Sequence, residues 1–222
     1  MIISVIIVAA GSSKRMGGKA NKPYINLKGL PVLCHSISSF FQNPRIKEII
    51  IAIRKKDEKI CCNLVKKYKY KNVKAVFGGK ARQDSVFNGL KAVRKDCRIV
   101  LIHDAARPFA SKKLIGNLIE NALKFRAVVP VIPVKETVKK SSDGNFIDAT
   151  LDRTKLFLAQ TPQAFDYKLL LSAYRKAYSE NISGTDDSML VERLGVPVKI
   201  VPGEEGNIKI TTKSDLERSR GK

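Results

Sequence analysis

Two kinds of hydrophobic pattern alternate along residues 1–133 of the chain. Short apolar runs rich in β-branched residues are typical of buried strands, whereas longer stretches with apolar positions every three to four residues are typical of amphipathic helices. These patterns predict strands at residues 2–8, 46–53, 73–77, 98–103 and 127–133. They predict helices at residues 31–41, 56–67, 82–93 and 111–125, and Ser111 is expected to cap the last of these.

The alternation of strand and helix predicts an α/β fold, with a mostly parallel sheet flanked by helices on both faces. We expect one Rossmann-like domain that spans residues 1–222. Ligands of such sheets bind outside the carboxyl ends of the strands. Because Gly11, Gly79 and Asp104 each follow a predicted strand, three motifs that are distant in sequence can meet at one crevice.

A polar segment at about residues 134–156 interrupts this pattern. Its Ser-Asp-Gly-Asn sequence at residues 142–145 is a strong hairpin turn signal. We predict an inserted β-hairpin arm, with short strands at residues 137–138 and 146–149. An isolated two-stranded ribbon is marginally stable in water, so the arm should pack on something. The residues leave open whether it packs on its own domain or on a second molecule.

The loop after the first predicted strand has the composition of a phosphate-binding loop. It starts with three small residues that let backbone amides approach a ligand, namely Ala9, Ala10 and Gly11. Four cations that suit polyphosphate charge follow, namely Lys14, Arg15, Lys19 and Lys22. The loop is not a Walker loop, because Ser13 and Ala20 stand where Gly and Ser or Thr would be needed.

The chain is strongly basic, with 42 Lys and Arg against 20 Asp and Glu and a net charge of +22. Such a charge attracts nucleotides and other polyanions without specifying a fold. Its cations are scattered over helix faces, and there is no aromatic ladder or zinc signature. We therefore interpret the charge as a solvated surface, and a basic nucleic-acid-binding protein remains the alternative from another class.

Cysteine spacing and hydropathy indicate where the protein works. The four cysteines have no Cys-x-x-Cys spacing, which argues for reduced thiols and against a structural zinc site. The apolar run at the N-terminus is short and leads directly into the glycine loop, and no stretch approaches the length of a membrane span. We expect a cytoplasmic protein with no membrane partner.

Five further motifs follow the first loop in a fixed order: Gly78-Gly79-x-x-Arg82, His103-Asp104-Ala105-Ala106-Arg107-Pro108, Thr161-Pro162-Gln163, Thr185-Asp186-Asp187 and Asn207-Ile208-Lys209-Ile210-Thr211. Together with the first loop they resemble the 2-C-methyl-D-erythritol 4-phosphate cytidylyltransferases from residue 2 to about residue 216. The resemblance implies cytidylyl transfer from CTP to methylerythritol phosphate in the non-mevalonate isoprenoid pathway, with release of pyrophosphate. A ribitol-phosphate or other pentitol-phosphate cytidylyltransferase is the nearest alternative, although Ala105 and Ala106 favour methylerythritol phosphate as the acceptor.

The resemblance also implies roles for individual residues. The catalytic candidates stabilise the transition state or hold the acceptor phosphate: Arg15, Lys22, Arg153 and Lys209. The CTP contacts are Ala9, Ala10, Gly11, Gly79, Ser85 and Asp104. The acceptor contacts are Arg107, Thr137, Thr161 and Thr185, and Arg107 is also expected to orient Asp104. Arg153 is implied to reach the neighbouring site of a homodimer through the arm. Mg²⁺ is implied to be bound mainly by the CTP triphosphate, with no metal ligand from the protein.

The implied reaction explains this choice of residues. A phosphate nucleophile is already anionic at neutral pH, so the enzyme needs alignment and charge neutralisation rather than a general base. His103 is accordingly interpreted as a packed strand residue. Asp186 and Asp187 are interpreted as the first turn of a helix that runs to Leu194. Two departures from the family pattern are Ser13 in place of a glycine and Lys80 in place of a frequent acidic residue.

Overall fold

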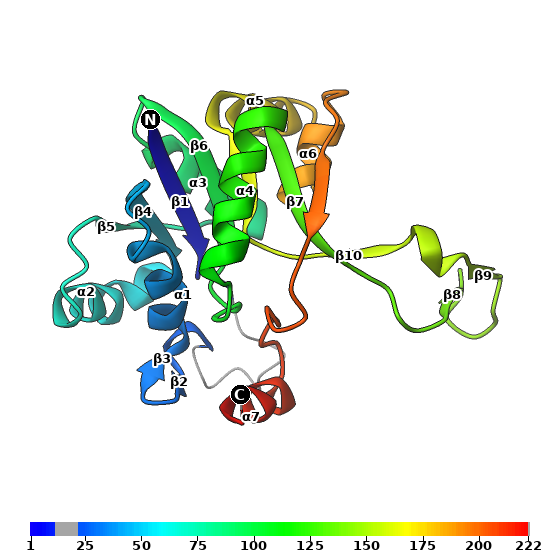
Figure 1. Cartoon of the computed structure of the whole chain (residues 1–222), viewed down its shortest axis with the longest axis horizontal. Coiled ribbons are helices and arrows are strands. Elements are labelled where there is room, and N and C mark those ends of the chain that lie inside the picture. Colours follow the sequence, from blue (N-terminus) through cyan, green and yellow to red (C-terminus); the bar gives the residue numbers. More distant parts are fainter. Residues whose placement is uncertain (12–21, 222) are drawn as a thin grey trace.

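The computed structural model of the chain describes residues 1–11 and 22–221. Its centre is an eight-stranded sheet in the order β10-β7-β11-β6-β1-β4-β5, and β12 also pairs with β7 (Figure 1). The strands of this sheet are β1 (Ile2–Val8), β4 (Ile46–Ile53), β5 (Val73–Phe77), β6 (Cys97–Asp104), β7 (Ala127–Pro133), β10 (Phe157–Ala159), β11 (Gln163–Asp166) and β12 (Lys199–Pro202). Two small ladders lie apart from it, formed by β2 (Asn26–Leu27) with β3 (Leu30–Pro31) and by β8 (Val138–Lys140) with β9 (Ala149–Leu151).

Most of the sheet is parallel. Strand β1 is parallel to β4 and β6, β4 is parallel to β5, and β12 is parallel to β7. Only β11 and β10 run against their neighbours. The predicted mostly parallel sheet is thus confirmed, and four of the five predicted strands have the expected bounds, while β6 is one residue longer at each end.

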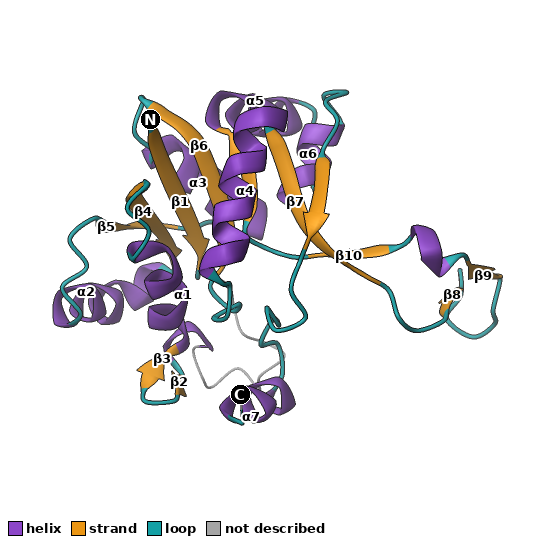
Figure 2. Cartoon of the chain, viewed as in Figure 1, coloured by secondary structure: helices purple, strands orange, loops and turns teal. Residues whose placement is uncertain are grey.

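Helices cover both faces of the sheet (Figure 2). Their bounds are α1 (Val32–Phe41), α2 (Glu58–Lys67), α3 (Arg82–Ala92), α4 (Lys112–Phe125), α5 (Tyr167–Ser179), α6 (Asp187–Glu192) and α7 (Lys213–Arg220). Helices α1, α2 and α4 pack on one core, and α3, α5 and α6 pack on the other. The predicted N-terminal cap of α4 is confirmed, because the Ser111 hydroxyl accepts the amide of Leu114.

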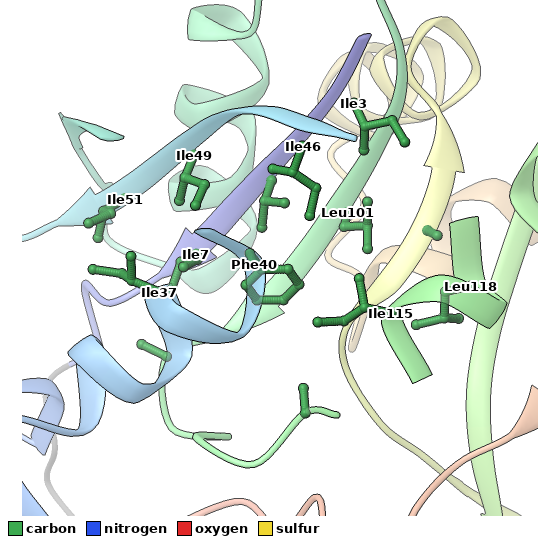
Figure 3. Packing of buried hydrophobic residues seen from close by; sticks show 14 of the residues in the cluster. Ile3, Ile7, Ile37, Phe40, Ile46, Ile49, Ile51, Leu101, Ile115 and Leu118 are labelled. Atoms are coloured by element: carbon green, nitrogen blue, oxygen red, sulfur yellow. The ribbon is translucent and has the colours of Figure 1, made fainter. Parts of the chain in front are cut away.

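The strands explain how one sheet serves two cores. Side chains of a strand alternate between its two faces, so Ile49 and Ile51 enter the first core whereas Ile50 enters the second. Figure 3 shows the first core, in which Phe40 of α1 lies near side chains of the sheet and of α4. Strands buried on both faces must be apolar at nearly every position, which is why the sequence pattern located them so well.

The carboxyl ends of the central parallel strands are level with one another. Val8 at the end of β1 is in register with Asp104 at the end of β6. Backbone bonds continue past the strand ends, from Ala9 N to Ala52 O at 2.8 Å and from Ala105 N to Val8 O at 3.1 Å. The loops that follow β1 and β6 therefore start side by side at this edge of the sheet.

The segment at residues 134–156 forms the predicted arm, which extends away from the sheet (Figure 1). Its two strands pair with Val138 opposite Leu151, and a bond from Val134 N to Leu156 O at 3.2 Å closes its base. The turn is wider than predicted. Phe146 and Ile147 lie in the turn rather than in a strand, because the Asp143 carboxylate captures the amides at positions 145 and 146.

The cysteines and the lengths of the helices bear on two expectations from composition. Cys34, Cys61 and Cys97 are buried free thiols and Cys62 is an exposed one, as expected. Across the described ranges, no helix combines the length and the apolar character that a membrane crossing would need.

Candidate functional site

A pocket of about 590 Å³ lies at the carboxyl ends of the central strands. This volume falls in the range of small-molecule sites. Its walls come from the loop after β1, the loop between β5 and α3, the end of β6 and the segment before α7. The predicted site residues that line it are Ala9, Ala10, Gly11, Lys22, Gly79, Ser85, Asp104 and Lys209. Three motifs that are distant in sequence thus meet at one crevice, as the strand pattern predicted.

Lys22 is tied to the C-terminal segment of the chain. It begins the short 3-10 helix η2 (Lys22–Tyr24), and its ammonium donates to the carbonyl of Thr211 at 3.2 Å. Asp215 in turn accepts the amide and the hydroxyl of Thr211, at 2.8 and 2.7 Å. The segment that carries Lys209 therefore also holds Lys22. Arg15 lies outside the described residues.

The loop between β5 and α3 is held by two side chains. The Ser85 hydroxyl accepts the amide of Gly79 at 3.1 Å and donates to the carbonyl of Ala81 at 3.0 Å. On the outer side, the Asp84 carboxylate accepts the amide of Ala81 at 2.9 Å and the Tyr178 hydroxyl at 2.5 Å. Ser85 thus braces this wall of the pocket as well as lining it.

Close packing explains the two glycines of this loop. A Cβ at Gly78 would lie 2.5 Å from the Cβ of Ala10, and one at Gly79 would lie 2.2 Å from the Cβ of Asp84. Carbon atoms do not approach this closely without a backbone shift. The loops after β1 and β5 are therefore in direct contact at Gly78, and a larger residue there would push the two walls apart, whereas one at Gly79 would collide with Asp84 of its own wall.

Asp104 is the carboxylate of the pocket, and it is almost fully buried at the end of β6. Arg82 Nε donates to one of its oxygens at 3.1 Å, and Lys209 Nζ contacts the other at 2.6 Å. Its backbone amide donates to the Thr161 hydroxyl at 3.0 Å. Burial alone would raise the pKa of Asp104, but the positive charges of Arg82 and Lys209 hold it well below its usual value. The carboxylate is therefore charged at neutral pH.

His103 is packed in the strand rather than exposed to the pocket. It is fully buried with its ring edge-on to Phe40, at a centroid distance of 4.9 Å. Burial lowers the pKa of His103 to about 4, so the ring is neutral at pH 7. Because Nε2 lies 2.9 Å from the carbonyl of Arg107, this nitrogen carries the proton. Nδ1 then accepts from the Thr161 hydroxyl at 3.3 Å.

Arg107 makes its described hydrogen bond to the C-terminal segment rather than to Asp104. Its Nη1 donates to the carbonyl of Asn207 at 2.7 Å, and burial lowers its pKa. The guanidinium that grips Asp104 is that of Arg82. Arg82 belongs to the recognised Gly-Gly-x-x-Arg motif, but no local pattern reveals its second partner, Asp187, which is 105 residues away in sequence. Sequence reasoning therefore missed its role.

The remaining predicted residues are not among the described residues that line the pocket: Arg107, Thr137, Arg153, Thr161 and Thr185. Thr137 and Arg153 lie on the exposed arm, where the Arg153 guanidinium bonds to the carbonyl of Lys135. Thr161 is buried, with its hydroxyl engaged by Asp104 and His103. Thr185 is exposed just before α6.

The start of α6 follows the sequence interpretation with one refinement. Asp186 caps the helix by accepting the amide of Met189 at 3.0 Å, and Asp187 is its first residue. The helix ends at Glu192, two residues before the expected Leu194. In the part of the chain that the structure describes, no group of three or more His, Cys, Asp or Glu residues could hold a metal ion.

The comparisons with known proteins agree with one another. A family model described as 2-C-methyl-D-erythritol 4-phosphate cytidylyltransferase matches residues 3–220. A protein of that name from Clostridioides difficile is 48% identical over 214 residues, which cover 96% of this chain and 90% of the relative. Another from Caldanaerobacter subterraneus is 46% identical over 218 residues, with 97% and 96% of the two chains covered.

Solved structures extend the likeness to the fold. The crystal structure of 4-diphosphocytidyl-2C-methyl-D-erythritol synthase from Anaerococcus prevotii superposes with a TM-score of 0.89 at 39% identity, over 99% of this chain and 97% of that one. The cytidylyltransferase from Francisella tularensis superposes with a TM-score of 0.84 at 32% identity, over 100% and 99% of the two chains. By sequence and by fold, this chain belongs to the 2-C-methyl-D-erythritol 4-phosphate cytidylyltransferase family.

Proposed function

We propose that this chain transfers the cytidylyl group of CTP to 2-C-methyl-D-erythritol 4-phosphate, forming 4-diphosphocytidyl-2-C-methyl-D-erythritol and pyrophosphate. Family membership supports the reaction. The observation that carries it is the pocket itself, which combines small residues at the end of β1 with the ammonium groups of Lys22 and Lys209. Such a site suits a triphosphate and a second phosphate group.

The chemistry requires positive charge and alignment. A phosphate oxygen of the acceptor attacks the α-phosphorus of CTP, the bond to the bridging oxygen breaks, and pyrophosphate leaves with its electron pair. Lys22 and Arg15 neutralise the charge that grows on the transferred group and the leaving group. Lys209 holds the acceptor phosphate for attack. No side chain has to remove a proton, which agrees with a His103 ring that is buried with both of its nitrogens hydrogen-bonded.

Ser85 supplies a reason for base selection. Its single hydroxyl proton is used on the carbonyl of Ala81, and one lone pair is used on the amide of Gly79. The remaining lone pair can only accept a hydrogen bond. The 4-amino group of cytosine is a donor and the 4-oxo group of uracil is an acceptor, so Ser85 favours CTP over UTP. In this proposal the wall that contains Gly78 and Gly79, which is in close contact with the loop after β1, leaves room for a pyrimidine and not for a purine.

Mg²⁺ accompanies the nucleotide in this proposal. The described pocket offers one carboxylate, that of Asp104, and both of its oxygens already contact cations. This donor set fits an ion carried by phosphate oxygens rather than one bound by protein ligands. When bound, the ion neutralises triphosphate charge, while Lys22 and Lys209 orient the two reacting groups.

The proposal includes a homodimer formed through the arm. The arm exposes three apolar side chains, since 76% of Phe146, 64% of Ile147 and 38% of Leu151 are accessible. A ribbon of two three-residue strands buries too little surface to stand alone in water. If a second copy of the chain covers these side chains, Thr137 and Arg153 of the first copy would approach the pocket of the second copy. There they would contact the acceptor.

The test is pyrophosphate release by the purified chain with CTP and each candidate acceptor. We expect release with methylerythritol phosphate that depends on Mg²⁺, with ATP and GTP inactive and UTP much slower. Faster release with ribitol phosphate would assign the chain to the pentitol branch instead. Equal rates with ATP would remove the cytidylyl assignment.

A further inference from the structure

Four side chains from four elements form one connected chain of polar contacts that starts in the pocket wall, which Arg82 and Asp104 line, and continues behind it to Asp187 and Tyr174. Arg82, the first residue of α3, donates from Nε to Asp104 at 3.1 Å and from Nη2 to Asp187 at 2.7 Å. Asp187, the first residue of α6, also accepts the Tyr174 hydroxyl of α5 at 2.5 Å. Asp187 is fully buried and Tyr174 nearly so. One guanidinium thus joins the nucleotide wall, the end of β6 and the start of α6.

Stability alone does not account for this arrangement. Replacing a buried ion pair by apolar residues of similar size is often neutral or stabilising, because desolvation offsets the attraction. Burial by itself lowers the pKa of Arg82, and Asp187 and Asp104 together raise it above its ordinary value. Burial and Asp187 likewise raise the pKa of Tyr174, which keeps its hydroxyl protonated as a donor. The arrangement therefore gives fixed geometry.

We propose that Arg82 is a positioning residue, which braces Asp104 against Asp187 and through Asp104 holds the Lys209 ammonium where the acceptor phosphate arrives. This inference rests on the proposed cytidylyl transfer. Lys209 contacts Asp104 at 2.6 Å, on the oxygen opposite the one that Arg82 holds. If Asp104 turns, Lys209 moves with it. Asp187 is the anchor, because its two oxygens are divided between Arg82 and Tyr174.

The forked shape of arginine is essential to the role. Nε and Nη2 point to different carboxylates at the same time, a task for which a single ammonium group lacks the geometry. Charge and geometry can therefore be separated by substitution. Arg82→Lys keeps the charge and loses the bridge, whereas Asp187→Asn keeps the guanidinium and weakens its anchor. Arg82→Gln removes both the positive charge and the bridge between the two carboxylates.

The charge state of Asp104 offers a readout that is independent of turnover. The groups that face it are Arg82 from α3, Lys209 from the segment before α7, and the Thr161 hydroxyl that accepts from its amide. The neutral ring of His103 lies next to Asp104 in the strand, and Arg107 acts on Asp104 by charge without a hydrogen bond between them. Asp187 and Tyr174 lie on the other side of Arg82. Without Arg82 two buried carboxylates lose their shared cation, so the pKa of Asp104 rises.

The first experiment measures kcat and KM for CTP and for methylerythritol phosphate in Arg82→Lys and Asp187→Asn. We expect kcat to fall about 100-fold, the scale of a misplaced reacting group, while KM for CTP stays near the wild-type value. Arg94→Gln is the matched control, because the Arg94 guanidinium pairs with Asp96 on the surface, away from the residues that line the pocket. This variant should keep wild-type kcat.

The second experiment follows the Asp104 carboxyl signal by NMR as pH falls, without substrate. In Arg82→Gln the signal should titrate at a higher pH than in the wild type, whereas in Asp187→Asn it should not move upwards. Wild-type kcat in both Arg82→Lys and Asp187→Asn, with only a lower Tm, would overturn the proposal. A raised KM for CTP at unchanged kcat would also overturn it, because Arg82 would then bind nucleotide directly. A wild-type chain without CTP-dependent turnover would remove the proposed function instead.

Discussion

Asp104 in the pocket is 8% exposed and is held by two cations, whereas Phe146 in the arm is 76% exposed. The pocket is built from loops that start side by side at a sheet edge and are braced by buried polar contacts. The arm has two strands of three residues each and bonds mostly within itself. The pocket is thus ordered by contacts within the chain, while the arm leaves its apolar side chains exposed.

The largest effect is expected in the pocket. Lys22→Ala and Arg15→Ala should each lower turnover by about two to three orders of magnitude, the loss seen when one preorganised oxyanion donor is removed. Steady-state pyrophosphate release at saturating CTP is the measurement. Lys176→Ala on α5, a surface lysine paired with Glu180, is the control. Near-native turnover in both variants would disprove the assignment of the cationic loop.

The next effect concerns the arm and the pocket together. Arg153→Ala should lower turnover about 100-fold, since bidentate contact with the acceptor phosphate is lost. If Arg153 acts on the neighbouring site, mixing this variant with Lys22→Ala should restore activity in proportion to the mixed dimer, because one of its sites keeps both residues. Subunit exchange is verified independently by mass spectrometry. No recovery despite exchange would mean that Arg153 serves its own chain.

A smaller effect is expected for base selection. Ser85→Ala removes the lone pair offered to the cytosine amino group, and the ratio of kcat/KM for CTP over UTP should fall about tenfold, the scale of one hydrogen bond. Ser179→Ala is the control, because that hydroxyl donates to the carbonyl of Lys176 on the surface and Ser179 is not among the described residues that line the pocket. An unchanged ratio would mean that the backbone of the loop alone selects the base.

The smallest effect is one of stability. Burial lowers the pKa of His103 from 6.5 to about 4, so below pH 6.5 the unfolded chain takes up a proton that the folded chain does not. The neutral ring therefore contributes to the free energy of unfolding above pH 6.5. This contribution is lost as pH falls towards 4, by about 1 kcal/mol per pH unit. Urea unfolding at pH 6.5 and 5.5 should therefore show a flatter pH dependence in His103→Gln. Equal slopes in the two proteins would contradict the buried neutral ring.

Prediction from sequence succeeded where a signal is local. The strands β1, β4 and β7 have the predicted bounds because both of their faces are buried over most of their length, so nearly every position is apolar. The edge strand β5 also has the predicted bounds, although its residues are only partly buried or exposed. The polarity and the turn residues of the arm predict its position correctly, but they predict a shorter turn than the structure has. Asp143 binds two backbone amides with one oxygen, and a strand pattern does not reveal that competition.

Local patterns and family motifs in the sequence were enough to predict the α/β fold, the bounds of the long strands and eight of the residues that line the pocket at the strand ends. The partner of each charged side chain follows only from the way the helices and strands pack. Arg82 holds Asp104 where Arg107 was expected to orient it, and it does so against Asp187, which is 105 residues further along the chain. Backbone preferences and apolar patterns act over a few residues, whereas ion pairs depend on which side chains the packed helices bring within about 3–4 Å.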